Sequence, residues 1–166
     1  YLKFAGEEDT GERSLNRNVP KTPAPFPPGT CVLLAEDNEL NREIVEELLS
    51  MFNITAVCAV NGREAVERFE ADPPGTYALI LMDIQMPVMD GYTAASAIRS
   101  LGKTGRRPDG TGIPIIALTA NAFADDVYRA KQAGMDEHVT KPLEISRLLE
   151  IMHRYLGGTV QNKSPD

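Results

Sequence analysis

Short apolar runs alternate with longer amphipathic segments along most of the chain. Five runs of four to seven residues are predicted to be strands: 31–35, 54–60, 77–82, 113–118 and 137–140. The segments between and after them repeat apolar residues every three or four positions. This spacing predicts helices at 38–52, 61–71, 91–101, 122–133 and 143–156. Strict alternation of strands and helices is typical of a parallel sheet that helices cover on both faces.

The third run indicates how the sheet is built. Residues 78–82 are all apolar, and the run ends at Asp83. A strand that is apolar on both alternating faces is covered on both sides. With right-handed crossovers, this predicts a flavodoxin-like doubly wound α/β fold: a five-stranded parallel sheet in the order 2-1-3-4-5 with five helices. That order places the carboxyl ends of the first and third strands side by side.

Polar residues mark where the helices begin. Asn38 is the expected N-cap of the first helix, and Asn61 with Glu64 is expected to form a capping box at the second. Segment 102–112 contains glycine and arginine and is expected to be an unusually long loop. In the first helix, one apolar stripe lies opposite the Glu and Arg residues and is expected to be buried: Leu40, Ile44, Leu48 and Phe52.

Composition and charge exclude several function classes. The 166 residues are 42% hydrophobic and 25% charged, with a net charge of −7 that argues against binding to nucleic-acid phosphates. No apolar run approaches the ~20 residues that a transmembrane helix needs. Cys31 and Cys58 fall in predicted strands. Without a His and Cys cluster, we interpret them as small core residues in a reducing compartment, not as a disulfide or a zinc site.

The two ends of the chain differ from its middle. Residues 1–30 are proline-dense at 21–29 and are interpreted as an extended linker, with a proline motif for a partner domain as the alternative. Residues 158–166 are a polar tail, so the folded domain is expected at 31–157. Tyr1 stands where an initiator Met is usual, and we therefore expect a piece of a longer protein.

Chemistry-bearing residues gather at the predicted strand ends. Glu36 and Asp37 follow the first strand, Asp83 follows the third, Thr119 follows the fourth and Lys141 follows the fifth. In the predicted order these residues meet at one edge of the sheet. Three carboxylates repel one another unless a cation binds, and such oxygen ligands suit Mg²⁺. A lysine and a hydroxyl can hold phosphoryl oxygens, which fits Asp83 as a nucleophile that forms an aspartyl phosphate.

Four motifs at these strand ends carry a resemblance to a known family. They are LLAEDN (33–38), LMDIQMPVMDG (81–91), ALTA (117–120) and KP (141–142). Residues 31–157 resemble a response-regulator receiver domain of two-component and phosphorelay signalling. The sequence at 36–38 and 119–122 most resembles receivers fused to hybrid sensor histidine kinases. Residues 1–30 are then expected to include the end of a kinase domain.

The resemblance implies the metal site and the phosphoacceptor. Asp83 is expected to accept a phosphoryl group from a phosphohistidine. Asp37 and Asp83 are expected to ligate Mg²⁺ directly, Glu36 through water, and Gln85 through its backbone carbonyl. The side chains of Gln85 and Asn121 occupy positions at which the family tunes the lifetime of the phosphoryl group.

The resemblance also implies a switch. Thr119 and Lys141 are expected to bind phosphoryl oxygens, and the peptide bond before Pro142 to be cis. When Thr119 moves inward, the side chain three residues before the lysine follows, which biases the surface of the fourth helix, fifth strand and fifth helix. The family often has Tyr or Phe there. This chain has His138, which is either the switch residue or an edge-strand histidine.

The implied partner is a protein that carries a phosphohistidine. This is the dimerisation and phosphoacceptor domain of a histidine kinase, a histidine phosphotransfer domain, or both. Leu48, Leu49 and Met51 are candidates for docking it, although part of this set is expected in the core. The domain is expected to catalyse its own phosphorylation and dephosphorylation, within a parent that is a histidine kinase. We expect no nucleic-acid partner, no direct insertion into a membrane, and a cytoplasmic location that includes tethering through the parent kinase.

Other readings of the same pattern are weaker. A flavodoxin-type FMN binder has a hydroxyl- or glycine-rich phosphate loop where this chain has Glu36 and Asp37. An Mg²⁺-dependent aspartate-nucleophile phosphatase has a second Asp as general acid two residues after the nucleophile, where this chain has Gln85. A P-loop signature is missing. A receiver-like docking module without phosphotransfer stays open.

Overall fold

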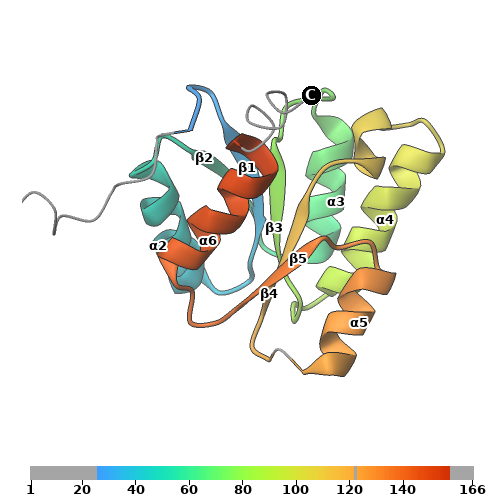
Figure 1. Ribbon diagram of the computed structural model, residues 1–166. Coiled ribbons are helices and arrows are strands. Elements are labelled where there is room, and N and C mark those ends of the chain that lie inside the picture. Colours follow the sequence, from blue (N-terminus) through green and yellow to red (C-terminus); the bar gives the residue numbers. More distant parts are fainter. Residues whose placement is uncertain (1–25, 122, 158–166) are drawn as a thin grey trace, which may run out of the picture.

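The computed structural model describes residues 26–121 and 123–157, so the predictions for residues 1–25 and 158–166 lie outside the described residues. Five parallel strands form one sheet in the order β2-β1-β3-β4-β5 (Figure 1). They are β1 (Cys31–Ala35), β2 (Thr55–Ala59), β3 (Leu79–Asp83), β4 (Ile115–Thr119) and β5 (Glu137–Thr140). The predicted fold class and strand order are confirmed.

Helices cover both faces of this sheet (Figure 1). On one face lie α2 (Glu39–Ser50) and α6 (Ile145–Met152), and on the other lie α3 (Gly62–Ala71), α4 (Gly91–Lys103) and α5 (Ala124–Gln132). Alternate residues of β1 enter the two cores, because successive side chains of a strand point to opposite faces. Val32 and Leu34 join the α2/α6 core, and Leu33 and Ala35 join the other.

The predicted N-caps Asn38 and Asn61 are confirmed, whereas Glu64 bonds the residue before Asn61 and so does not complete the predicted capping box. The Oδ1 atom of Asn38 accepts a hydrogen bond from the N–H of Asn41 (2.9 Å), and that of Asn61 accepts one from the N–H of Glu64 (2.8 Å). The Glu64 carboxylate reaches back to the N–H of Val60 (2.6 Å), one residue before the cap. These bonds satisfy backbone donors that a helix start leaves unpaired.

The predicted buried stripe of the first helix is wrong for Leu40 and Ile44, whereas Phe52 packs against the α2/α6 core and Leu48 is half-buried. Val45 and Leu49 form the core side of α2, whereas Leu40 is 64% exposed and Ile44 is 48% exposed. Both sets have helical spacing, so the helix is apolar on two faces and periodicity alone does not tell which one is buried. The exposed face includes Met51, which is 71% exposed.

Segment 102–112 is more ordered than the predicted loop. Helix α4 continues to Lys103, and Pro108–Thr111 forms a short 3₁₀ helix, η1. Between them Arg107 is 1% exposed; its guanidinium lies 4.0 Å from the ring centre of Phe69 and donates to the carbonyl of Asp72 (2.6 Å). The buried cation ties this segment to the loop that precedes β3, at the amino edge of the sheet.

The last predicted helix is shorter than expected and continues differently. The α-helix ends at Met152, and His153–Gly157 forms a π-helical turn, η2. Phe26, which the sequence places in the linker, is 3% exposed and stacks on His153 with 4.3 Å between ring centres. The segment just before β1 therefore packs into the α2/α6 core.

The two cysteines lie on neighbouring strands. Cys31 in β1 and Cys58 in β2 are partly buried, and neither forms a disulfide. Burial, together with the carboxylate of Glu46 at 2.6 Å from the thiol sulfur, raises the pKa of Cys58 to about 12. This thiol therefore stays protonated at neutral pH. No helix in the described part of the chain is long and apolar enough to cross a bilayer.

Candidate metal centre

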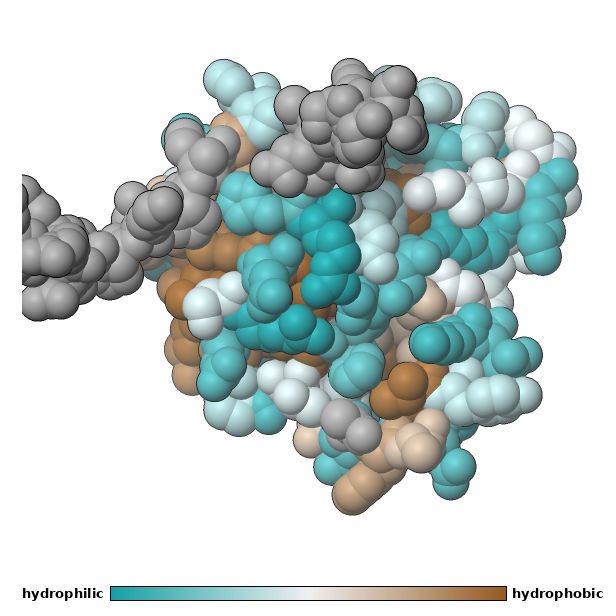
Figure 2. Space-filling view, viewed as in Figure 1, coloured by the Kyte–Doolittle hydropathy of each residue, from teal (hydrophilic) through white to brown (hydrophobic). Residues whose placement is uncertain are grey.

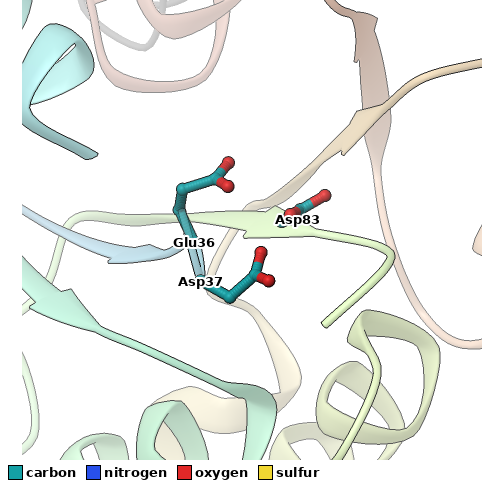
Figure 3. Close-up of side chains that lie close together, drawn as sticks. All are labelled: Glu36, Asp37 and Asp83. Carbon is teal, nitrogen blue, oxygen red and sulfur yellow. The ribbon is translucent and has the colours of Figure 1, made fainter. Parts of the chain in front are cut away.

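Three carboxylates meet where β1 and β3 end. Glu36 and Asp37 directly follow β1, and Asp83 is the last residue of β3. One carboxylate oxygen from each lies within 4.8 Å of the other two, and the three side chains project side by side (Figure 3). Strands β1 and β3 are neighbours in the sheet, which is why residues 46 positions apart come together.

Lysine 141 is the cation of this cluster. Its Nζ lies 3.0 Å from a carboxylate oxygen of Glu36 and 3.2 Å from one of Asp83. It follows β5 at the far end of the sheet and crosses to the cluster along the carboxyl edge. The Lys141–Pro142 peptide bond is cis. Burial alone lowers the pKa of Lys141, but the hydrogen bond to Glu36 and the charge of Asp83 outweigh it and raise that pKa.

Glu36 is the most firmly held of the three acids. It is 1% exposed, and besides Lys141 its carboxylate accepts hydrogen bonds from the N–H of Asn38 (3.2 Å) and the amide of Asn41 (3.4 Å). Asp37 is exposed and faces the open side of the cluster. Glu36 is thus a buried carboxylate with three hydrogen-bond donors, and Asp37 beside it is accessible. The two can therefore take different roles as metal ligands.

The surroundings of Asp83 disfavour its ionised form. It is 4% exposed. Burial, the charge of Glu36 and, less, that of Asp37 raise its pKa to about 6, although Lys141 acts in the opposite direction. At neutral pH Asp83 is therefore ionised, but at a cost in free energy that a bound cation relieves.

The donor set fits a hard divalent cation. Three carboxylates border a cavity of about 200 Å³, which Asn41, Gln85, Ala120 and Lys141 complete. Mg²⁺ prefers oxygen ligands, keeps several waters and uses one or two carboxylates at sites where it also meets a phosphate. The cavity has room for those waters and for a phosphoryl group beside Asp83.

Thr119 lies at the same edge, at the end of β4. Its hydroxyl donates to the carbonyl of Asn121 (2.7 Å) and accepts from the N–H of Asn121 (3.1 Å), so it is turned toward its own loop. Beside it is a cavity of about 10 Å³ that Tyr92 and His138 also line. A space of that size holds at most one water, so a side chain that enters it must displace another.

His138 also lines this small cavity, from the neighbouring strand β5. It is half-buried on β5, in register with Ala117 of β4, and it lines both the inner cavity and a wider depression outside it. The structure therefore places His138 between the interior beside Thr119 and the surface of α5 and β5. Gln85 is exposed and lines the cavity of the metal centre, whereas Asn121 is exposed and lines the small cavity beside Thr119.

Two contacts near the site escape sequence reasoning. The guanidinium of Arg129 in α5 lies 4.3 Å from the ring centre of Tyr92 in α4, and both residues line an open cleft of about 470 Å³ that Asp37 also borders. Arg42 in α2 donates to the backbone carbonyls of Glu36 and Asp37. Neither contact has a sequence signature, although the position of Arg42 just after the acidic motif is a weak signal.

Comparison with known proteins gives one family. Residues 32–153 match the family described as "Response regulator receiver domain". The peroxide stress-activated histidine kinase mak1 of Schizosaccharomyces pombe is 36% identical over 161 residues, which are 97% of this chain and 9% of that protein. The sensor histidine kinase GacS of Pseudomonas protegens is 33% identical over 81% of this chain and 14% of its own length. The chain thus spans less than a sixth of these relatives.

Solved structures give the same result. The receiver domain of the sensor histidine kinase PA1611 from Pseudomonas aeruginosa, with a magnesium ion coordinated in its active site cleft, has a TM-score of 0.68 and 36% identity, covering 78% of this chain and 98% of that one. The receiver domain of Ssk1 from Saccharomyces cerevisiae, crystallised with the histidine phosphotransfer protein Ypd1, has a TM-score of 0.71 and 31% identity, covering 81% and 92%.

Proposed function

Because this chain belongs to the response regulator receiver domain family and is a receiver domain of phosphorelay signalling, we propose that Asp83 is its phosphoacceptor. One observation carries the proposal: the last residue of β3 is a buried carboxylate with Lys141 and two further acids around it. A nucleophile, a cation for the phosphoryl oxygens and a set of metal ligands are thereby in one cavity.

The proposed reaction uses these residues in distinct roles. A carboxylate oxygen of Asp83 attacks the phosphorus of a phosphohistidine; the O–P bond forms as the P–N bond breaks, and its electron pair goes to the imidazole nitrogen. Lys141, 3.2 Å from Asp83, holds one phosphoryl oxygen after it separates from Glu36. Asp37, Asp83, Glu36 through water and the Gln85 carbonyl would hold Mg²⁺, which would supply positive charge beside the phosphoryl oxygens.

The proposed switch starts at Thr119. Its hydroxyl now bonds only within residues 119–121, so it is available to turn toward a phosphoryl oxygen on Asp83. That turn enlarges the small cavity beside it, and His138, which also lines the cavity, moves in. Because His138 also borders the outer depression at α5 and β5, its movement changes the surface of α5, β5 and α6.

We propose that the donor docks on the exposed apolar face of α2. Leu40 and Ile44 are 64% and 48% exposed in the half of α2 that follows the loop of Glu36 and Asp37, and Met51, the C-cap at the other end of the helix, is 71% exposed. Figure 2 shows hydrophobic residues on the side of the molecule that α2 and α6 form. Such a surface fits an apolar helix face of a histidine-bearing domain. The Ssk1 receiver, similar in structure, is itself bound to a histidine phosphotransfer protein.

The parent protein is proposed to be a hybrid histidine kinase, like the relatives that match this chain. Such a kinase makes its phosphohistidine from ATP, so we propose that the receiver works in the cytoplasm, directly or tethered through the kinase.

The test is intact mass after incubation with Mg²⁺ and acetyl phosphate, a donor that needs no docking. We expect one added phosphoryl group on the unmutated domain. We expect none on the Asp83→Asn variant, and none on the unmutated domain after chelation of Mg²⁺. If the unmutated domain gains no phosphoryl group from acetyl phosphate or from a purified phosphohistidine protein, the domain is a docking module and the proposal is wrong. Turnover of phosphate monoesters without a stable adduct instead indicates the phosphatase.

A further inference from the structure

Arg42 is tied to the backbone of the acidic loop. Its Nη1 donates to the carbonyl oxygen of Glu36 (2.9 Å) and to that of Asp37 (3.1 Å). These residues carry two of the three carboxylates of the metal centre. Arg42 lies one turn into α2, and its own N–H bonds to the Asn38 carbonyl (3.0 Å), so its side chain starts from a fixed point.

The two carbonyls lie in the short loop between the end of β1 and the start of α2. The last bond of the β1 ladder on this side runs from the N–H of Glu36 to Ala59, and the α2 pattern begins with the carbonyl of Asn38. Between these bonds the chain turns from strand to helix, where the sheet and helix supply no regular partner to the carbonyls. The guanidinium supplies one partner for both.

The side chains of this loop are held separately. Asn38 and Asn41 donate to the Glu36 carboxylate, and Lys141 bonds it from the other side. None of these donors reaches Asp37, whose carboxylate is exposed. The direction of the Asp37 side chain therefore depends on the backbone, and Arg42 is what fixes the Asp37 carbonyl.

Repulsion among the three carboxylates opposes the arrangement that Arg42 holds in place. With three like charges within 4.8 Å, an unrestrained loop lowers its energy by turning Asp37 away from Glu36 and Asp83. We propose that Arg42 is a positioning residue of the metal centre: it holds the Glu36–Asp37 backbone so that both carboxylates stay directed at Asp83 before the cation binds. This inference rests on the proposed role of the cluster as an Mg²⁺ site.

The role predicts a specific loss in Arg42→Gln. Groups that orient metal ligands typically contribute 10–100-fold to metal affinity. We expect the Kd for Mg²⁺, measured by calorimetry without a phosphodonor, to rise by about 10-fold or more. We expect the Mg²⁺ concentration for half-maximal phosphorylation by acetyl phosphate to rise equally, with the maximal rate restored at saturating Mg²⁺. Arg42→Lys keeps the charge but has a single ammonium that reaches less far than the arginine Nη atoms, and we expect it to recover only part of the affinity.

The control is Arg68→Gln on α3. This arginine is also on a helix surface, in an i,i+4 pair with Glu64, and its loss changes the net charge equally. We expect an unchanged Kd. Amide shifts of Glu36 and Asp37 by NMR, and thermal unfolding without Mg²⁺, separate a local change from a general one.

The outcomes are distinguishable. A lower Tm of Arg42→Gln with unchanged Mg²⁺ affinity means a structural role and overturns the inference. An equal loss in Arg68→Gln means that net charge, not position, sets the affinity, and overturns it as well. If the unmutated domain binds no Mg²⁺, the proposed metal site and this inference are both wrong. If the unmutated domain and Arg42→Gln bind Mg²⁺ with the same Kd, only this inference is wrong.

Discussion

Replacing Asp83 with asparagine is expected to stabilise the metal-free domain at neutral pH. Asp83 is buried beside two other acids, and its pKa is raised from 3.8 to about 6. At about 1.4 kcal/mol for each pH unit, keeping Asp83 ionised in the folded state costs about 3 kcal/mol relative to the unfolded chain. Asparagine has nearly the same shape and no charge, so it removes this cost.

The gain depends on pH in a defined direction. The folded state holds the Asp83 proton more tightly than the unfolded state does, so between about pH 4 and pH 6 the folded state carries more protons and stability falls as the pH rises. Above pH 6 the full cost is present. The advantage of Asp83→Asn over the parent is therefore expected to be about 3 kcal/mol at pH 7.5, about half of that at pH 5, and close to zero at pH 3.

The assay is urea unfolding in EDTA at pH 7.5 and pH 5, followed by circular dichroism. Glu67→Gln is the control, because it removes one charge from an exposed carboxylate on α3 and is expected to change stability by less than about 0.5 kcal/mol. Saturating Mg²⁺ is expected to stabilise the parent much more than Asp83→Asn; at 100 times its Kd a ligand adds about 2.7 kcal/mol. If Asp83→Asn is no more stable than the parent at pH 7.5, or its advantage is the same at both pH values, the electrostatic account of the site is refuted.

Three further outcomes are expected. Arg107→Met removes a buried guanidinium and leaves backbone carbonyls unpaired, so urea unfolding should show a loss of about 2–4 kcal/mol; the rate of phosphorylation should not change, because Arg107 lies at the opposite edge of the sheet. Phe26→Ala empties a core position against His153 and should cost about 3 kcal/mol in the same assay; an unchanged midpoint would mean that residue 26 is only a linker. Alanine at Gln85 or at Asn121 should change the half-life of the phosphorylated domain, measured by mass, and an unchanged half-life in both variants would remove them from the site.

The sheet and the position of the site were predictable for one physical reason. Parallel strands that are buried on both faces need unbroken apolar runs, and residues 78–82 show this pattern plainly. Alternation with helices makes the sheet parallel, so the residues after each strand must share an edge, and in the order 2-1-3-4-5 the ends of β1 and β3 are neighbours. The proximity of Glu36, Asp83 and Lys141 therefore follows from topology, although they are up to 105 positions apart.

What the sequence could not supply depends on partners far along the chain. Helix α2 is apolar on two faces, and only the packing against β1 and α6 decides that Val45 is buried and Leu40 exposed. Arg107 looks like a loop arginine because its acceptor carbonyl at Asp72 lies 35 positions away. Arg42 bonds backbone carbonyls, which every residue has, so no side-chain pattern reports the contact.

The charge balance of the metal-free site also implies an order of events. Lys141 bonds both Glu36 and Asp83, so its ammonium is already paired before any phosphoryl group arrives. An incoming phosphoryl group would meet three carboxylates and an ammonium that is already paired with two of them, and repulsion would oppose its approach. A divalent cation that took up the carboxylate charge would free Lys141 to turn to a phosphoryl oxygen. We therefore expect that the same clustering of charge that destabilises the metal-free domain makes phosphorylation depend on prior metal binding.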